Sequence, residues 1–323
     1  IYNQFLRLYS IDRIKKRSVM KLKSILLLFL LGLVPFLLTA QIEKEPSTLL
    51  EFEAQMAEWG NTIIFDSLQE NRLAANTQMV QTIEKVLGMP GAFDYPFDSL
   101  KTVSFQYPAD STFRIITWQL YVDMETYQYF GFIQKGGEQP VVTKLVDKSE
   151  EIDDITYDAV TADQWYGAVY YRMISFDTPD GVQHLLFGFD GHSLFRKRKL
   201  IDVLTFQNGK AVFGSPVFSP EDITRTDQYK NRIMLEYSAE ANVGVNYNTN
   251  IEMIMMDHLI PFSGSAQIEG ETFVPDGSYE GYKLQGALWV YKEKLFDQVS
   301  ETAPRPKPIL EGRKGRNIVG KKQ

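Results

Sequence analysis

The chain of 323 residues contains no cysteine and only three histidines. The absence of cysteine excludes disulfide bonds, thiolate metal sites, cysteine nucleophiles and lipid attachment at an N-terminal cysteine. A three-histidine metal centre would need His184, His192 and His258 together, and no His-Glu-x-x-His motif is present. We therefore expect no metal ion and no other cofactor.

The glycine motifs of several common enzyme classes are also missing. The chain has no Gly-x-Ser-x-Gly elbow, no phosphate-binding Gly-x-x-x-x-Gly-Lys-Ser/Thr and no Gly-x-Gly-x-x-Gly. The acidic residues between Glu150 and Asp158 lack the spacing of a calcium loop, so we interpret them as a solvated connector. No complete catalytic motif remains, in a chain whose 44% hydrophobic and 23% charged residues are typical of a globular protein.

Residues 20–40 have the three regions of a secretory signal peptide. A basic start is followed by the apolar run 25–38 and by small residues that predict cleavage between Ala40 and Gln41. Because this run is shorter than the roughly 20 residues of a membrane span, we expect export to the periplasm or cell envelope, with no transmembrane span after signal removal. The alternative is a membrane-tethered assembly factor that retains the run as an anchor.

Charge is distributed unevenly along the chain. Residues 1–23 and 302–323 each carry a net charge of +6, whereas 39 acidic and 20 basic residues between them give −19. An acidic body disfavours nucleic acid, because neutralising phosphates needs a basic surface. We expect residues 1–19 to be an upstream extension, and 299–323, which combine prolines with basic residues, to be a disordered basic tail.

The segment 41–100 is predicted to be helical. Thr48 and Glu51 have the spacing of a capping box, which predicts a helix from near Thr48 to Gly60. A second periodic apolar pattern continues to Leu87. The apolar faces of these helices need a partner to cover them, so we expect the segment to pack on a β body.

Residues 101–298 are predicted to form an antiparallel β domain. Short aromatic and β-branched runs alternate with turn residues, and three pairs of runs flank turns at 123–126, 178–181 and Asn208–Gly209. Runs such as 115–122 are apolar on both faces, which must therefore both be covered. We expect a mainly β fold with a helical N-terminal segment, in which the antiparallel meander forms a two-layer sandwich or a propeller-like or barrel-like body.

Two clusters carry the residue types of acid–base or ligand-binding chemistry. Asp190 and His192 precede four cationic residues, Arg196–Lys199. Together these side chains could bind an anionic or carbonyl group beside an acid–base pair. The structural alternative is a glycine turn followed by cations that lie in solvent at a strand end. Asp257 and His258 lie in an apolar run, where strand alternation predicts opposite faces and no simple pair. A hydrogen-bonded histidine that ends a buried strand is the alternative for His258.

Abundant aromatic residues include two tryptophans, Trp118 and Trp165, which on an exported acidic protein could line a sugar-binding groove. We expect most aromatic side chains to lie in the core. The ligand-binding candidates are therefore Asp190, Asp257, His258, Trp165 and Trp118, and no catalytic residue is assigned.

Several short segments are distinctive when taken together. They are Tyr95–Leu100, Phe113–Ile115 with Trp118, Tyr129–Ile133, Trp165–Ala168, Leu200–Leu204, Asp257–Leu259 and Pro275–Tyr279. These segments resemble a family of uncharacterised exported proteins of Bacteroidota, over about 50–295. The resemblance implies export and a β-rich body, without an assigned activity. The family usually has Trp at the position of Phe189 and Asn at that of His192, which weakens His192 as a ligand, whereas Asp190, Asp257 and His258 lie in matching motifs.

The sequence favours an exported, non-catalytic binding or envelope-assembly module whose partner is an envelope protein or a glycan. The alternative is a carboxylate-dependent hydrolase acting on an envelope or dietary glycan, which needs two suitably spaced carboxylates. Convergence of Asp190 and His258 in one pocket with a tryptophan would favour catalysis or small-ligand binding, and their separation would favour a scaffold.

Overall fold

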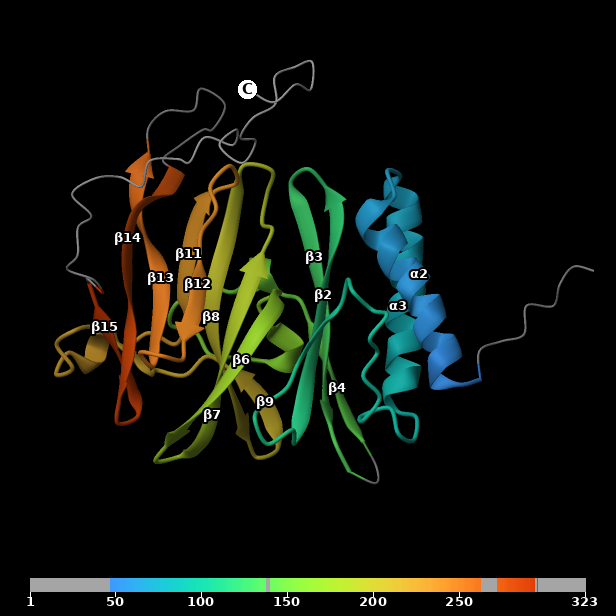
Figure 1. Cartoon of the computed structure of the whole chain (residues 1–323), viewed down its shortest axis with the longest axis horizontal. Helices are drawn as coiled ribbons and strands as arrows, with labels where there is room; N and C mark the ends of the chain where they lie inside the picture. Colours follow the sequence, from blue (N-terminus) through green and yellow to red (C-terminus); the bar gives the residue numbers. More distant parts are fainter. Residues whose placement is uncertain (1–46, 138–139, 263–271, 294, 296–323) are drawn as a thin grey trace, which may run out of the picture. The chain divides into compact units, whose positions relative to one another are not determined.

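The computed structural model describes residues 47–137, 140–262, 272–293 and 295 (Figure 1). The predicted upstream extension, signal peptide and basic tail lie outside these residues. Contacts divide the chain after Thr48, and every helix and strand named below belongs to the compact unit that begins at Leu49. Neither of the two α-helices described in that unit is long and apolar enough to cross a membrane.

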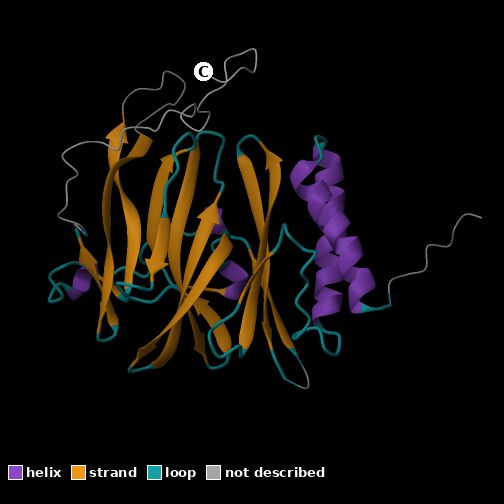
Figure 2. Cartoon of the chain, in the orientation of Figure 1, coloured by secondary structure: helices purple, strands orange, loops and turns teal. Residues whose placement is uncertain are grey.

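Two helices, α2 (Leu49–Phe65) and α3 (Gln69–Leu87), pack side by side (Figure 2). The first begins where the capping pattern predicts but continues through Gly60, which was predicted to end it. Gly60 instead allows the helix to approach Thr102 closely, because a Cβ atom at this position would overlap Oγ1 of Thr102. Between the helices, the carboxylate of Asp66 accepts a hydrogen bond from the backbone N–H of Leu68, 2.8 Å away.

The described strands form three sheets, and all of these strands pair antiparallel except β10 with β15. The first sheet has the order β1-β2-β3-β4, with β1 (Ser104–Gln106), β2 (Phe113–Asp123), β3 (Thr126–Lys135) and β4 (Val141–Val146). The middle sheet has the order β5-β9-β8-β7-β6 with β11 beside β8, and comprises β5 (Val160–Thr161), β6 (Val169–Thr178), β7 (Gly181–Asp190), β8 (Arg196–Gln207), β9 (Lys210–Phe213) and β11 (Ile233–Ser238). The third sheet has the order β10-β15-β14-β13-β12, with β10 (Phe218–Ser219), β12 (Val245–Asn248), β13 (Met253–Phe262), β14 (Thr272–Gln285) and β15 (Leu288–Lys292).

Three buried clusters hold the layers together in the order helices, first sheet, middle sheet, third sheet (Figure 2). Because successive side chains of a strand point to opposite faces, Trp118 of β2 faces the helices whereas Ile115 faces the middle sheet. In the same way Leu200 of β8 faces the first sheet and Ile201 faces the third. Strands apolar on both faces therefore belong to sheets covered on both sides, as the sequence predicts.

None of the three sheets closes on itself within the described strands, so the predicted antiparallel sandwich is confirmed and gains a third sheet. The three predicted hairpins are also present, as β2–β3, β6–β7 and β8–β9. In the last of these, Asn208 (φ 51°) and Gly209 (φ 80°) supply the two positive φ angles of a type I′ turn.

Candidate functional site

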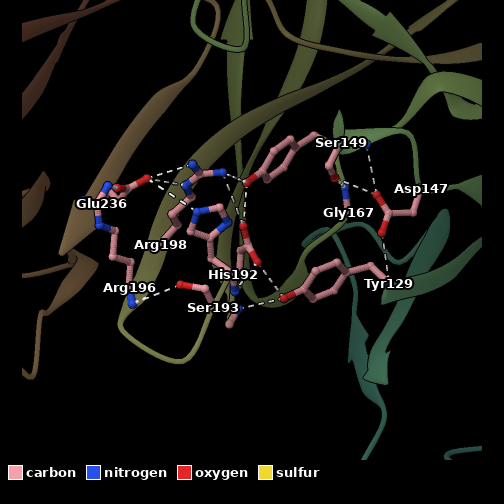
Figure 3. A network of polar contacts seen from close by, with 12 residues as sticks. Tyr129, Asp147, Ser149, Gly167, His192, Ser193, Arg196, Arg198 and Glu236 are labelled. Carbon is pink, nitrogen blue, oxygen red and sulfur yellow. Dashed lines mark hydrogen bonds and ion pairs between the residues drawn. The ribbon is translucent and has the colours of Figure 1, made fainter. Parts of the chain in front are cut away.

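Strand pairing brings three charged residues into one row at the end of the middle sheet. Asp190 of β7 lies opposite Arg198 of β8, which in turn lies opposite Glu236 of β11. Directly opposed residues project to the same face, here the one toward the first sheet. Arg198 donates to Oε2 of Glu236 from Nε (2.8 Å), and its Nη2 lies 2.7 Å from the same oxygen, while its Nη1 lies 4.0 Å from Oδ2 of Asp190 (Figure 3).

Both carboxylate oxygens of Asp190 are occupied by donors. The hydroxyl of Tyr129, on β3 of the first sheet, donates to Oδ1 at 2.8 Å, and the hydroxyl of Tyr166 donates to Oδ2 at 2.6 Å. The backbone N–H of His192 also donates to Oδ1 (2.7 Å), and that of Gly191 donates to the Tyr129 hydroxyl (2.7 Å). With only 4% of Asp190 exposed, this carboxylate ties the loop after β7 to the first sheet.

The two tyrosines remain protonated donors in this cluster. Burial, and then the negative charge of Asp190, raises the pKa of Tyr129 and Tyr166 well above the usual value for a phenol. Neither hydroxyl therefore ionises near neutral pH, and neither supplies a proton acceptor for catalysis.

Glu236 forms hydrogen bonds with both Arg196 and Arg198. Nη1 of Arg196 donates to Oε1 at 2.9 Å, on the side opposite to Arg198 (Figure 3). Although burial opposes its ionisation, hydrogen bonds from Arg198 and Arg196 lower the pKa of Glu236 overall. The two guanidinium groups are thus paired and partly buried rather than lying in solvent at a strand end, and the carboxylates of Asp190 and Glu236 balance their charge.

His192 lies at the edge of this cluster with positive φ (48°). Its Nε2 is 3.8 Å from Oε2 of Glu236, and 29% of its side chain is exposed. Burial, and then the positive charge of Arg198, lowers the pKa of His192. The imidazole is therefore neutral at pH 7.

The polar network extends from Tyr129 into the segment that follows β4. Oδ2 of Asp147 accepts the backbone N–H of Tyr129 (2.9 Å), and Oδ1 accepts the hydroxyl of Ser149 (2.6 Å). The same hydroxyl oxygen accepts the backbone N–H of Gly167 at 2.9 Å (Figure 3). These bonds fix connecting segments against the sheets and occupy both oxygens of the Asp147 carboxylate.

The two candidate tryptophans are core residues, with exposed fractions of 0% for Trp165 and 1% for Trp118. Nε1 of Trp165 donates to the hydroxyl of Tyr170 (2.9 Å), which donates to the buried carboxylate of Asp202 (3.3 Å). Nε1 of Trp118 donates to Oδ1 of Asn76 on α3 (2.8 Å). Neither ring has a face open to a ligand.

Asp257 and His258 lie on β13 of the third sheet, where the register with β14 shifts immediately after Asp257. This irregularity interrupts the regular alternation on which the prediction of opposite faces depends. Asp257 accepts the backbone N–H of Gly244 (2.7 Å), while Nδ1 of His258 lies 3.1 Å from Oδ2 of Asp276. Hydrogen bonds from Ser278, and then from His258, lower the pKa of Asp276 to about 2. His258 is thus a partly exposed, hydrogen-bonded side chain rather than one that ends a buried strand.

Asp190 and His258 belong to different sheets and share no partner among the residues that the structure describes. Sequence reasoning missed Tyr129, Tyr166 and Glu236, the residues that complete the Asp190 cluster. Tyr129 is 61 positions from Asp190, and the packing of two sheets brings them together. Glu236 is 38 positions from Arg198, and the pairing of β11 with β8 brings them together. Across the described ranges, no group of three or more His, Asp and Glu side chains is placed to hold a metal ion.

Comparison of the chain with models of protein families, with curated proteins and with solved structures found no match. The resemblance to exported proteins of Bacteroidota stays a prediction.

Proposed function

We propose that this chain is an exported, non-catalytic binding protein of the cell envelope. One observation carries this proposal. The candidate acid–base side chains already form hydrogen bonds within the protein, and they lie in separate places. Asp190 accepts from two tyrosines and a backbone N–H, and Asp257 accepts from a loop. His258, on the third sheet, lies beside the carboxylate of Asp276.

A general acid or base must reach the proton that it moves and must exchange it near the working pH. Asp190 is buried and its two oxygens already accept hydrogen bonds, so a substrate atom would first have to displace a tyrosine. The contacts of Asp190 support a structural role, in which the carboxylate joins two sheets.

Export is supported by the pattern of residues 20–40. We expect full-length protein with a C-terminal tag, expressed in a Gram-negative bacterium, to appear in the periplasmic or envelope fraction with Gln41 as its first residue. A double substitution of the apolar run, Leu28→Arg with Leu31→Arg, is the control and is expected to hold the protein in the cytoplasm. Cytoplasmic wild-type protein would contradict export, and a product that retains 25–40 would contradict cleavage.

The non-catalytic part of the proposal is tested by incubating the purified protein with a panel of envelope and plant glycans. We expect no increase in reducing ends above that of a heat-denatured sample. An increase that is lost in Asp190→Asn or Asp257→Asn protein that remains folded would overturn the proposal in favour of the hydrolase.

A further inference from the structure

A cavity of about 430 Å³ lies between the middle and third sheets. Its lining comes from β11 on one side and from β10, β13, β14 and β15 on the other, together with Tyr157, Pro220, Gln228 and Lys230 of the connecting segments. No member of the Asp190 cluster lines it. The volume is within the range of pockets that hold small molecules, about 300–1,000 Å³.

Aromatic rings set at steep angles to one another form part of the wall. The rings of Phe218 and Tyr282 are 5.4 Å apart and inclined at 70°, and those of Tyr282 and Tyr291 are 5.5 Å apart and inclined at 62°. Ile233 and Met256 add apolar surface. The cavity therefore offers apolar contact from more than one direction to a ring-shaped ligand.

Glu280 places a carboxylate in this apolar surface. On β14, Glu280 and Tyr282 lie opposite Met256 and Ile254, whose side chains pack toward the middle sheet. Oε2 of Glu280 accepts the hydroxyl of Tyr291 (2.6 Å). Burial, and then this carboxylate, raises the pKa of Tyr291, which therefore stays a donor. Oε1 has no hydrogen bond from any residue in the described ranges and remains able to accept one from a ligand.

Three further polar residues of the lining, Tyr157, Gln228 and Lys230, have side chains without a hydrogen bond or ion pair to any residue that the structure describes. Tyr157 is 45% exposed and lies where solvent can enter. The polar groups of this cavity thus differ from those of the Asp190 cluster, because they are available to a ligand. Together they supply a phenol, an amide, an ammonium group and a carboxylate, which include both donors and acceptors.

We propose that this cavity binds a neutral saccharide ring, an inference that rests on the proposed function as a non-catalytic binding protein. The opposite charges of Glu280 and Lys230 disfavour strong selection for an anion or a cation. Aromatic walls can contact the C–H face of a sugar, while its hydroxyls pair with the mixed donors and acceptors. Glu280 is the one carboxylate in the described lining, whereas glycosidases flank the scissile bond with two. The ligand is therefore held and not cleaved.

Isothermal titration of the mature protein, processed from the full-length chain, tests this inference. The probes are cellotriose, xylotriose, β-1,4-mannotriose and triacetylchitotriose, with benzyltrimethylammonium as a cationic comparison. We expect at least one trisaccharide to bind and the ammonium compound not to bind.

Two substitutions locate the binding site. Glu280→Gln removes the charge from a hydrogen bond to the sugar and is expected to weaken binding about tenfold. Tyr157→Ala removes an exposed aromatic surface and is expected to weaken binding by a similar factor. The control is Glu221→Gln, an exposed carboxylate that pairs with Lys292 and does not line the cavity; it should bind as wild type does. Circular dichroism confirms that each variant is folded.

The outcomes separate the inference from the function on which it rests. Trisaccharide binding that is unchanged in both cavity variants, binding of the ammonium probe alone, or no binding at all would overturn the inference. Reducing ends are measured in the same mixtures. If they increase, the proposed non-catalytic function fails; if they do not and no probe binds, the inference alone fails.

Discussion

The environment of Asp190 decides whether its carboxylate is available for chemistry. Two phenols and a backbone N–H occupy its oxygens, and the side chain is almost completely buried. The sequence shows an acid beside a histidine and a cluster of cations, a composition that fits either a site or a turn. The partners that distinguish the two, Tyr129 and Tyr166, come from other elements, so the composition near Asp190 could not identify them.

Replacing Tyr129 tests this environment with a matched control. Tyr129→Phe removes one of the two donors to Oδ1 of Asp190, leaving only the N–H of His192, and takes away the hydroxyl that accepts the N–H of Gly191. We expect the free energy of unfolding to fall by about 1–3 kcal/mol. Tyr127 lies on the same strand, and its hydroxyl has no hydrogen bond within the described ranges. Tyr127→Phe should therefore change stability by less than about 0.5 kcal/mol. Equal effects of the two substitutions in urea unfolding would contradict the role given to Tyr129.

The histidines give a pH dependence with a definite sign. Burial lowers the pKa of His184, and burial together with Arg198 lowers that of His192, below the ordinary 6.5. The unfolded chain binds more protons as the pH falls through 6.5, so the contribution to stability is present above this pH and is lost below it. The lowered pKa of Glu236 acts in the same direction, but only below its ordinary value of 4.5.

We expect His192→Asn to reduce the loss of stability between pH 7 and pH 5, and His184 to account for part of what remains. Urea unfolding at the two pH values, with wild-type protein as reference, measures the difference. A loss of equal size in the variant would show that His192 does not contribute.

At the scale of elements, local signals predict hairpins better than they predict strands that contain turn residues. The Asn208–Gly209 turn is visible because its backbone needs two positive φ angles, which these residues tolerate. In contrast, β14 contains Pro275 and Gly277, which are typical of turns. The strand accommodates them at the irregular pairing beside His258, so its course depends on β13.

The close contact between Gly60 of α2 and Thr102 leads to a prediction about helix packing. Alanine is favoured over glycine in a helix by about 1 kcal/mol, but its Cβ would overlap Thr102 Oγ1. We expect Gly60→Ala to destabilise the wild-type protein, because overpacking costs about 1–3 kcal/mol. In a Thr102→Ala background the oxygen is gone and the remaining neighbours are at ordinary distance, so the same change should stabilise. A double-mutant cycle in urea measures the coupling, and additive effects would contradict the close contact.

At the scale of the whole molecule, the sequence predicts a sandwich from runs that are apolar on both faces but does not predict three sheets. The number of layers depends on which strands pair, and pairing joins segments distant in the sequence. The same limit applies to the cavity, which Phe218, Ile233, Glu280 and Tyr291 reach from four strands. No single stretch of sequence contains enough of its lining to indicate a site.

The central claim is that the polar groups near Asp190 hold the layers together, whereas those near Glu280 are available to a ligand. The most direct measurement is urea unfolding of Asp190→Asn beside Glu280→Gln. In Asp190→Asn the amide N–H₂ faces a tyrosine hydroxyl that is itself a donor, and the negative charge near Arg198 is lost. We therefore expect the free energy of unfolding to fall by about 2–3 kcal/mol. In Glu280→Gln the amide oxygen can still accept the hydrogen bond from Tyr291, so the free energy of unfolding should fall by less than about 1 kcal/mol. An Asp190→Asn protein as stable as wild type would contradict the account.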